Sequence, residues 1–525
     1  MEYLPNLRTV PDISRHFAET QPDHVALRLG DQAVTYKELN LGSNQIAQAL
    51  LAQGLAPGDR TVWLGRNSCR YFEYLIGACK AGVTPTPVNW RLTAFEVEQI
   101  ITDAKPNLIF TDREFRSNIP AVITGRLPVI LTDADASETM SYDGWKSVAS
   151  TTDPTLDTDP EATCLQIYTS GTTGHPKGAM IAHRSFLALM RASCSPRHGA
   201  ISVNDLCLVA MPIFHVGGST YGLNVLYAGA TMILHADVNP ETIVNDIRNL
   251  KIAHAFVVPT VIQMMLAVES ADAAAFSSMQ DIGYGASPIA QPVLEQAMQQ
   301  FQCGFRQVYG MTEMTGAITI MTPAEHEIAV AEKPSLLKSC GKTIPGVELR
   351  IVDSNGANEL PGEIGEIALK GDMMMTGYWG RPDAFADAVR DGWYFSGDAG
   401  YLDDDGFLYI CDRIKDMIIS GGENIYPAEI ESVLIGHDGV LDAAVIGVPN
   451  EKWGEEVKAF IVANPNELVS AEELITYCVD KLASFKLPKT VEFIDIVPRN
   501  GAGKVQKNVL RETSQMKSSS DGSHK

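Results

Sequence analysis

A tract of hydroxyl, glycine and lysine side chains at residues 168–178 has the residue types that bind phosphate. It holds little that a hydrophobic core could use. Its glycines allow backbone N–H groups to turn toward an anion, and its hydroxyls can donate hydrogen bonds. The hydroxyl residues include Thr169, Ser170, Thr172 and Thr173, the glycines include Gly171 and Gly174, and the cation is Lys177. We therefore predict a phosphate-binding loop that follows a strand over residues 163–168.

The tract lacks the P-loop pattern of kinases and GTPases. That pattern places Ser or Thr directly after the lysine, where the hydroxyl holds Mg²⁺. Here Lys177 follows a proline and precedes Gly178. An enzyme of the P-loop class is therefore disfavoured. If the nucleotide is ATP, its metal ligand must come from another part of the chain.

The composition describes a large, acidic, globular protein. The 525 residues exceed what one core usually holds, and a hydrophobic content of 45% can fill at least two domains. A net charge of −23 disfavours nucleic acid and anionic membrane surfaces as partners. Nine scattered cysteines without a C-x-x-C pair indicate reduced thiols rather than a zinc site. The chain has neither a membrane-spanning apolar run nor a signal sequence, so we expect a cytoplasmic protein without integral membrane association.

The helices and strands of the fold must bring the phosphate-binding loop together with a metal ligand from another part of the chain. Residues 35–38 and 93–96 have the sequence of capping boxes, and each opens an amphipathic helix that leads to a short apolar strand. After about residue 340 the chain changes to short strands separated by Gly and Asp turns, which indicates a smaller β-rich subdomain. From Pro427 onward a compact α+β unit follows. The alternation of helix and strand predicts layered α/β architecture with mostly parallel sheets.

The expected fold class is therefore α/β. It comprises a large N-terminal domain of layered α/β subdomains with the β-rich subdomain, and a small C-terminal α+β domain. A charged segment between two apolar strands, residues 412–416, marks the boundary. We expect an N-terminal domain over residues 1–411, a hinge over 412–415, a C-terminal domain over 416–514 and a disordered tail over 515–525.

Further polar segments follow the phosphate loop, and together they resemble a known family. They are residues 283–287, 309–313, 393–398, 412–427 and 498–504. In this order, over most of the chain, they resemble the adenylate-forming superfamily of acyl-CoA synthetases, non-ribosomal adenylation domains and luciferases. The runs at 87–92 and 420–431 are most similar to bacterial fatty-acyl-CoA and aryl-CoA ligases.

The resemblance implies a two-step reaction. A carboxylate attacks the α-phosphorus of ATP and expels pyrophosphate, and the thiol of coenzyme A (CoA) then captures the acyl adenylate. The implied ligands are ATP, Mg²⁺, CoA and a small-molecule carboxylic acid. Because the carboxylate and the triphosphate are both anions, Mg²⁺ and fixed cations must screen their approach. Positioning and electrostatics, not a protein nucleophile, would carry the chemistry.

The resemblance assigns ATP contacts to residues from several segments. The β- and γ-phosphates would be held by Thr169, Ser170, Gly171, Thr172, Thr173, Gly174 and Lys177. Adenine would be framed by Gly285, Ala286, Ser287, Gln307 and Tyr309, and the ribose held by Asp398 and Arg413. Thr312 would reach the α-phosphate. Glu313 would hold Mg²⁺, which supplies the metal ligand that the loop itself lacks.

The resemblance also implies a mobile C-terminal domain that serves both half-reactions. Lys504 would enter from this domain, orient the substrate carboxylate, bind ATP and stabilise the transition state of adenylation. Lys415 matches the hinge about which the domain rotates before the thiol enters. Gly421 and Gly422 would line the CoA passage.

His215 is expected to act as an aromatic gate beside the carboxylate site. Gly217 and Gly218 follow it closely and would leave space for an acyl chain or a large ring. We identified no acidic or basic residue in this pocket that would recognise a polar group of the substrate.

These assignments predict an AMP-forming carboxylate–CoA ligase that acts on a medium- or long-chain fatty acid. Two alternatives keep the same chemistry: a ligase for an aryl or aryl-propenoic acid, and an acyl-AMP ligase that loads a carrier protein. A non-catalytic binding protein is disfavoured, because the residues assigned to phosphate, metal, ribose and carboxylate are all intact. The sequence is compatible with a homodimer.

Overall fold

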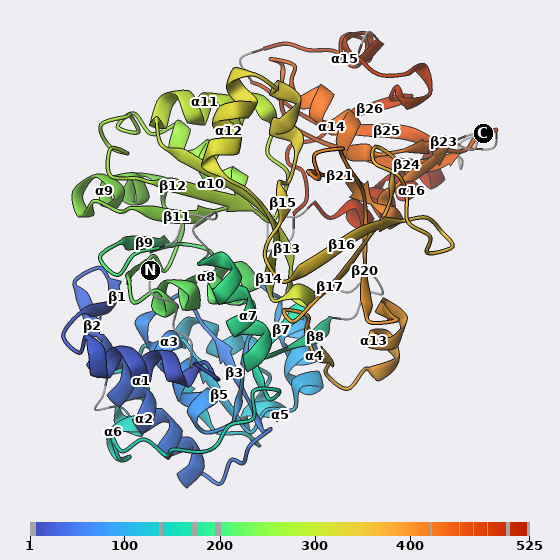
Figure 1. The fold of residues 1–525 in the computed structure, drawn as a ribbon. Coiled ribbons are helices and arrows are strands. Elements are labelled where there is room, and N and C mark those ends of the chain that lie inside the picture. The colour runs from blue at the N-terminus through green and yellow to red at the C-terminus, as the bar shows by residue number, and fades with distance from the viewer. Residues whose placement is uncertain are drawn as a thin grey trace.

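The computed structural model describes most of the chain. The described residues are 7–135, 138, 140–169, 176–194, 201–420, 423–450, 452–465, 467–479, 481–499 and 505–521, with side chains as far as residue 514. Four of the five sheets belong to the first 413 residues, and the fifth belongs to a separate C-terminal unit. Figure 1 shows this unit, coloured orange to red, at the opposite end of the molecule from the blue N-terminal helices. The α/β fold class is confirmed.

A parallel four-stranded sheet organises the first 150 residues. Its strand order is β4 (Thr84–Pro87), β3 (Arg60–Leu64), β5 (Leu108–Thr111) and β6 (Val129–Leu131). The accompanying helices are α1 (Pro11–Thr20), α2 (Tyr36–Ala52), α3 (Cys69–Lys80), α4 (Ala94–Ala104), α5 (Ala121–Thr124) and α6 (Tyr142–Ser147). The two predicted capping boxes are present, with Thr35 opening α2 and Thr93 opening α4. Every residue of β4 and β5 is buried, as expected for a sheet covered on both faces.

The largest sheet has nine strands and supplies much of the site. Its order is β15 (Lys342–Thr343), β14 (Gly316–Met321), β13 (Gly304–Met311), β12 (Asp281–Gly285), β11 (His254–Val257), β9 (Leu206–Val209), β10 (Thr231–Leu234), β1 (Val25–Leu29) and β2 (Gln32–Thr35). The helices in this part are α7 (His183–Ser193), α8 (Val216–Tyr227), α9 (Pro240–Leu250), α10 (Pro259–Leu266), α11 (Gln291–Phe301) and α12 (Pro323–Ala331). The strands from β1 to β13 in this order are parallel, while the edge strands β2, β14 and β15 are antiparallel.

Two antiparallel sheets complete the first unit. The three-stranded sheet has the order β18 (Gly377–Tyr378), β8 (Lys177–Ala182) and β7 (Thr163–Thr169). The five-stranded sheet contains β16 (Val347–Val352), β17 (Gly365–Gly371), β20 (Trp393–Leu402), β19 (Val389–Arg390) and β21 (Leu408–Arg413), with α13 (Pro382–Ala388) beside it. This second sheet is the β-rich region that the sequence predicted after residue 340.

The C-terminal unit is an α+β layer with its own core. Its strands are β22 (Ile418–Ser420), β23 (Glu423–Ile425), β24 (Val440–Asn450), β25 (Gly454–Ala463) and β26 (Thr490–Phe493), and its helices are α14 (Pro427–Ile435), α15 (Ala471–Val479) and α16 (Lys507–Asp521). Two apolar clusters lie within this unit alone. The backbone of α16 continues to Asp521, whereas the sequence predicted a disordered tail from residue 515.

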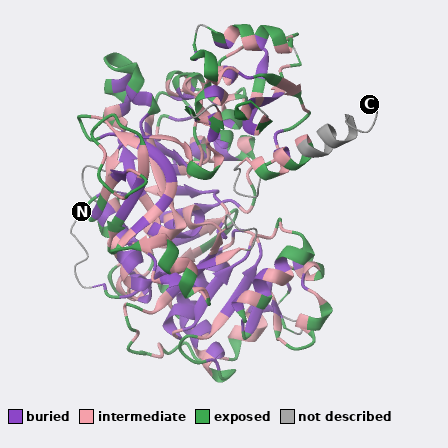
Figure 2. Cartoon of the chain, turned by 90° about the vertical axis from the view of Figure 1, so that its right-hand side faces the viewer, coloured by how far each residue is buried: buried purple, intermediate pink, exposed green. Residues whose placement is uncertain are grey.

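Burial follows the sheets. Figure 2 shows buried residues gathered in the strands and exposed residues along the outer helices and loops. All nine cysteines are free thiols. Within the described residues, none of the helices combines the length and the apolar composition needed to span a bilayer.

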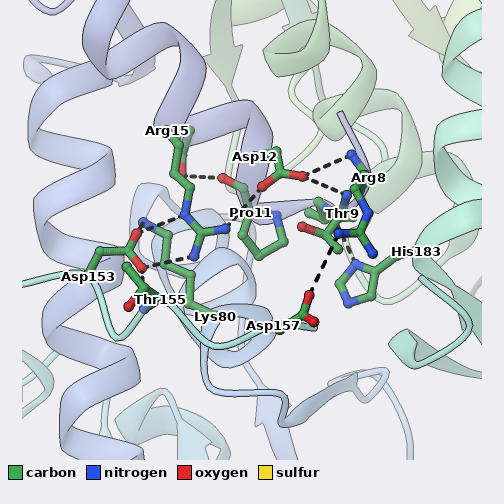
Figure 3. Close-up of polar contacts among 12 residues, drawn as sticks. Arg8, Thr9, Pro11, Asp12, Arg15, Lys80, Asp153, Thr155, Asp157 and His183 are labelled. Carbon is green, nitrogen blue, oxygen red and sulfur yellow. Dashed lines mark hydrogen bonds and ion pairs between the residues drawn. The ribbon is translucent and has the colours of Figure 1, made fainter. Parts of the chain in front are cut away.

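A buried charged cluster remote from the cleft described below ties α1 to the segment before β7 (Figure 3). Arg15 holds both oxygens of Asp153 at 2.9 Å. Lys80 is fully buried, and its Nζ lies 2.6 Å from side-chain oxygens of Asn40 and Asn44 and 3.6 Å from Asp153. Burial lowers the pKa of Lys80 to about 7, against the opposing charge of Asp153. These contacts hold the segment that precedes β7 against α1, α2 and α3.

Candidate active site

A cleft of about 2120 Å³ lies where the nine-stranded sheet, the five-stranded sheet and the C-terminal unit meet. It gathers residues that the sequence analysis took from widely separated motifs. The predicted site residues in its lining are Thr169, Lys177, His215, Gly217, Ala286, Ser287, Gln307, Tyr309, Thr312, Glu313, Asp398, Arg413 and Lys415. The fold therefore brings most of the described candidates to one place.

Several predicted site residues lie outside the described residues. They are Ser170, Gly171, Thr172, Thr173, Gly174, Gly421, Gly422 and Lys504. The flanks of the phosphate tract are described: β7 and β8 are antiparallel, and Thr169 pairs with Lys177. The tract thus joins two paired strands, and Lys177 begins the second of them.

Two glycines of the predicted site are required by the packing of the main chain. A Cβ on Gly218 would lie 2.2 Å from the carbonyl oxygen of Pro212, and one on Gly285 would lie 2.2 Å from that of Val308. Each glycine therefore permits a close approach of main chain. Gly217 differs, because it lines the cleft and a Cβ there would lie 3.3 Å from the ring of Phe256.

Glu313 and Lys177 are connected through a tyrosine that the sequence analysis missed. Glu313 lies in the single turn η3 (Thr312–Met314), directly after β13. Tyr378 Oη donates a hydrogen bond of 2.9 Å to Glu313 Oε1, and Lys177 Nζ lies 5.2 Å from the centre of the Tyr378 ring. Burial raises the pKa of Tyr378, so its hydroxyl stays protonated and donates. The sequence signal was an aromatic pair after Gly377, whose φ of 154° favours glycine.

Tyr309, Asp398 and Arg413 form a second polar group in the cleft. Tyr309 Oη donates to Asp398 Oδ2 at 2.6 Å, and Arg413 Nε lies 2.6 Å from Oδ1. Asp398 and Arg413 face each other across the paired strands β20 and β21. Burial and the charge of Asp398 raise the pKa of Tyr309, which keeps this hydroxyl protonated. Each carboxylate oxygen can accept a second hydrogen bond, so Asp398 retains acceptor capacity toward a ligand.

The segments predicted to frame adenine contain a sharp turn at Ala286 and a buried acceptor at Gln307. Ala286 has φ of 66°, which turns the chain sharply after β12. Gln307 Nε2 lies 3.5 Å from Cys340 Sγ, while its Oε1 is buried without a hydrogen-bond partner among the described residues. A buried amide oxygen normally has a donor. The exocyclic amino group of a purine could donate a hydrogen bond to this oxygen.

His215 precedes α8 and lies in the cleft beside Phe214. The two ring centres are 4.6 Å apart, and the carbonyl of His215 accepts hydrogen bonds from Gly218 N and Ser219 N at the start of the helix. These contacts fix the backbone of His215, the predicted gate, at the N-terminus of α8.

The cleft wall beside α8 is more polar than the sequence indicated. The cleft lining next to α8 includes His254, Asp281 and Arg306. His254 and Asp281 begin neighbouring parallel strands, so they meet at one edge of the sheet. The sequence identified no acidic or basic residue here that would recognise a polar group, whereas these three residues line the cleft. None of the three belongs to a recognisable motif, but the alignment of strand starts could have suggested them.

Ion pairs connect the predicted hinge to α16. Lys415 lies in the turn η5 (Ile414–Asp416) and lines the cleft. Lys507 Nζ lies 3.0 Å from Glu431 and 3.8 Å from Asp412, and Arg511 Nη2 lies 2.9 Å from Asp416. The acids that flank Lys415 are therefore neutralised from the C-terminal unit.

Two sequence profiles match the chain. The profile of the AMP-binding enzyme family matches residues 14–379. The chain belongs to this family. The profile of the AMP-binding enzyme C-terminal domain matches residues 429–504. The resemblance to the adenylate-forming superfamily is confirmed.

Characterised relatives cover nearly the whole chain. The fatty acid–[acyl-carrier-protein] ligase ScoC of Streptomyces coeruleorubidus is 41% identical over 97% of both chains. A feruloyl-CoA synthase from an Amycolatopsis species is 35% identical and covers 94% of this chain and 96% of its own. The long-chain-fatty-acid–CoA ligase FadD13 of Mycobacterium tuberculosis is 35% identical, over 92% of this chain and 93% of the relative.

Solved structures agree with the fold. ATP-bound MatB from Rhodopseudomonas palustris has a TM-score of 0.88 at 29% identity and covers 96% of this chain and 99% of its own. The o-succinylbenzoate CoA synthetase MenE of Bacillus subtilis, in complex with ATP and a magnesium ion, has a TM-score of 0.83 at 30% identity over 94% of this chain and 98% of its own. The chain is thus a member of the superfamily of AMP-forming acyl and aryl ligases, and these relatives differ in acid and in acceptor.

Proposed function

We propose that this protein is an AMP-forming ligase that activates an aliphatic carboxylic acid of the fatty-acid class with ATP and Mg²⁺ and passes the acyl group to the thiol of CoA. The observation that carries this proposal is the convergence in one cleft of two groups from distant segments: Lys177, Tyr378 and Glu313 on one side, and Tyr309, Asp398 and Arg413 on the other.

ATP fits the second group. The ribose hydroxyls need acceptors, and Asp398 is a buried carboxylate with acceptor capacity left after its bonds to Tyr309 and Arg413. The buried Oε1 of Gln307 suits the amino group of adenine. Ala286, in the left-handed region, bends the backbone that would lie against the flat ring.

Mg²⁺ fits a site with few protein ligands. Magnesium bound to nucleotide phosphates usually takes one or two carboxylates and keeps its waters. Glu313 supplies a carboxylate that Tyr378 orients, and among the described residues no group of three or more His, Cys, Asp or Glu forms a separate cage. The bound ion would neutralise phosphate charge while Lys177 screens the same anion from the other side.

The acid is proposed from the shape of the cavity beside α8. Gly217 leaves room next to His215, and the opposite wall presents Phe256 and Gly283. The polar residues His254 and Asp281 lie further along, at the starts of their strands, and Arg306 is in register with Gly283. Because these polar residues limit the apolar part of the cleft, we favour the medium end of the predicted medium-to-long range.

A carrier-protein thiol is the second candidate acceptor. The relative with 41% identity over 97% of both chains is a fatty acid–[acyl-carrier-protein] ligase, whereas the CoA-dependent relatives described above are 35% identical. CoA and a carrier protein present the same pantetheine arm. The first half-reaction is therefore common to both candidates, and only the second distinguishes them.

The test is a screen of pyrophosphate release over short, medium, long and aromatic acids, followed by thioester formation with CoA and with a pantetheine-loaded acyl carrier protein. We expect release to require an aliphatic acid, and CoA to give the higher kcat/KM. The carrier protein without its pantetheine is the control. Preference for an aromatic acid would contradict the proposed acid, and preference for the loaded carrier protein would establish the second candidate.

A further inference from the structure

The face of α8 that lines the cleft becomes more polar along the helix, away from His215. Gly217, Thr220, Tyr221 and Asn224 line the cleft, and their spacing of three and four residues places them on one face of the helix. The helix rises about 6 Å from Gly217 to Tyr221 and about 10 Å to Asn224. Next to His215 the lining of the helix is therefore Val216 and the side-chain-free Gly217, and hydroxyl and amide groups follow further in.

The sheet opposite this helix shows the same change. Phe256, Gly283 and Arg306 are in register across the parallel strands β11, β12 and β13, so they project from one face. A Cβ on Gly283 would lie 2.9 Å from Phe256 Cδ2, so only glycine leaves a slot between the ring and the arginine. His254 and Asp281 lie two residues earlier on the same face, toward the starts of the strands.

These residues form a compact charged floor. Asp281 Oδ2 lies 2.7 Å from Arg306 Nη2 and 3.0 Å from His254 Nδ1, and His254 Nε2 lies 3.4 Å from Asp205. The Asp281 and Arg306 side chains are 7% and 15% exposed. A hydrocarbon chain that ended here would displace water from these polar groups without forming a hydrogen bond to them, which is unfavourable.

Tyr221 stands between the apolar part of the cavity and this floor. Its ring lies 5.7 Å from that of Phe256, and its hydroxyl is buried without a hydrogen-bond partner among the described residues. Burial raises the pKa of Tyr221, so the hydroxyl is protonated and can both donate and accept. Buried hydroxyls are normally paired, and a ligand group is the partner that this position lacks.

We propose that the acid carries a neutral polar group, such as a hydroxyl or an oxo group, at the end remote from its carboxylate, and that Tyr221 recognises this group. The inference rests on the proposed adenylation reaction and specifies its substrate. An anionic end group is disfavoured, because Asp281 and Arg306 already offset each other and Asp205 adds a further negative charge. The floor lies beyond Tyr221 and would leave a plain alkyl end facing polar groups without a hydrogen bond.

The experiment compares straight-chain acids with the ω-hydroxy acids of the same length, by acid-dependent pyrophosphate release. In the wild type we expect kcat/KM for the hydroxy acid of matching length to exceed that of the alkyl acid by about tenfold or more, because a site built to bond a hydroxyl rejects the analogue without it. Tyr221→Phe keeps the ring and removes the hydroxyl. It should lose about tenfold on the hydroxy acid and leave the alkyl acid unchanged or improved.

Tyr227→Phe is the matched control, since Tyr227 lies on the same helix but outside the cleft lining, and it should preserve the preference for the hydroxy acid. A wild-type preference for the alkyl acid would overturn the proposal. So would an equal loss on both acids in Tyr221→Phe, which would mark a structural role. Failure of the adenylation reaction itself is distinguishable, because no acid of any kind would then release pyrophosphate.

Discussion

A single side chain can connect residues that belong to different sequence motifs. Tyr378 contacts both the predicted metal ligand Glu313 and the predicted phosphate cation Lys177. It lies in the two-residue strand β18, which follows both residues in the sequence and precedes the C-terminal unit. Its hydroxyl also lies 3.4 Å from that of Tyr394. Orientation of the carboxylate therefore depends on a residue that makes no predicted contact with ATP.

Tyr378→Phe tests this orienting role. The variant removes one hydrogen bond to a charged group, which contributes about 1.5 kcal/mol, so we expect KM for Mg·ATP to rise about tenfold with kcat less affected. Steady-state kinetics over a range of Mg·ATP would measure it. Tyr477→Phe is the control, because Tyr477 donates a similar bond of 2.8 Å to Gly436 O away from the cleft. Equal changes in both variants would refute the role.

Lys504→Ala tests the residue that the family resemblance places at the reacting carboxylate. A fixed cation that stabilises charge only during adenylation should affect only that step. We expect carboxylate-dependent pyrophosphate exchange to fall by a factor on the order of 100 or more, while thioester formation from supplied acyl adenylate survives. The exposed Lys489 offers a control as Lys489→Ala. Equal loss of both half-reactions would argue against the assignment.

At the scale of elements, the predicted hinge is a short turn. Lys415 sits in η5 between β21 and β22, and the acids on either side are paired with α16. Rotation of the C-terminal unit would have to be absorbed by the φ and ψ angles of this turn.

Lys415→Pro should separate the two half-reactions. Proline fixes φ and restricts the residue before it, so the turn loses the freedom to rotate. We expect adenylation, measured by pyrophosphate exchange, to remain within about threefold of wild type while thioester formation is blocked. Lys415→Ala keeps the rotation and should support both steps. Normal overall turnover in the proline variant would rule out the hinge assignment.

Elements set by local sequence could be predicted, whereas those set by distant contacts could not. The capping boxes of α2 and α4, the Asn239 cap of α9 and the strand before the phosphate tract involve neighbours in the chain. The place of β1 beside β10 depends on pairing between Leu27 and Met232, which no local pattern reports.

The same division applies to the site. The residues predicted to bind ATP lie in contiguous motifs, and these motifs carry the family resemblance. The proposed acyl cavity draws Tyr221, Asp281 and Arg306 from three elements, and each alone looks like an ordinary core or strand residue. Gly218 shows the converse error, because a glycine near a pocket can equally serve a close approach of main chain.

Across the whole molecule, two buried histidines predict how stability depends on pH. Burial lowers the pKa values of His183 and His326 to about 4. Both rings accept hydrogen bonds as neutral bases, His183 from Val10 N and His326 from the Tyr284 hydroxyl. The unfolded chain would protonate them near pH 6.5 and the folded chain only near pH 4, so stability is lost as the pH falls through this window.

We expect each histidine to cost on the order of 3 kcal/mol of stability between pH 6.5 and pH 4. The measurement is the midpoint of thermal unfolding across this range. The double variant His183→Asn, His326→Gln retains hydrogen-bonding groups that do not titrate, and its midpoint should depend less on pH. His16→Gln serves as the half-exposed control. An unchanged acid slope in the double variant would contradict the prediction.

The ion pairs between the hinge and α16 bear on how the protein is made. Asp416 and Arg511 are 95 residues apart, so translation at 5–20 residues per second separates their emergence by roughly 5 to 20 s. During that interval the nascent N-terminal unit can fold while its hinge acids still face water. The contact between Asp416 and Arg511 can form only after α16 has been made, so until then the start of the C-terminal unit lacks this ion pair.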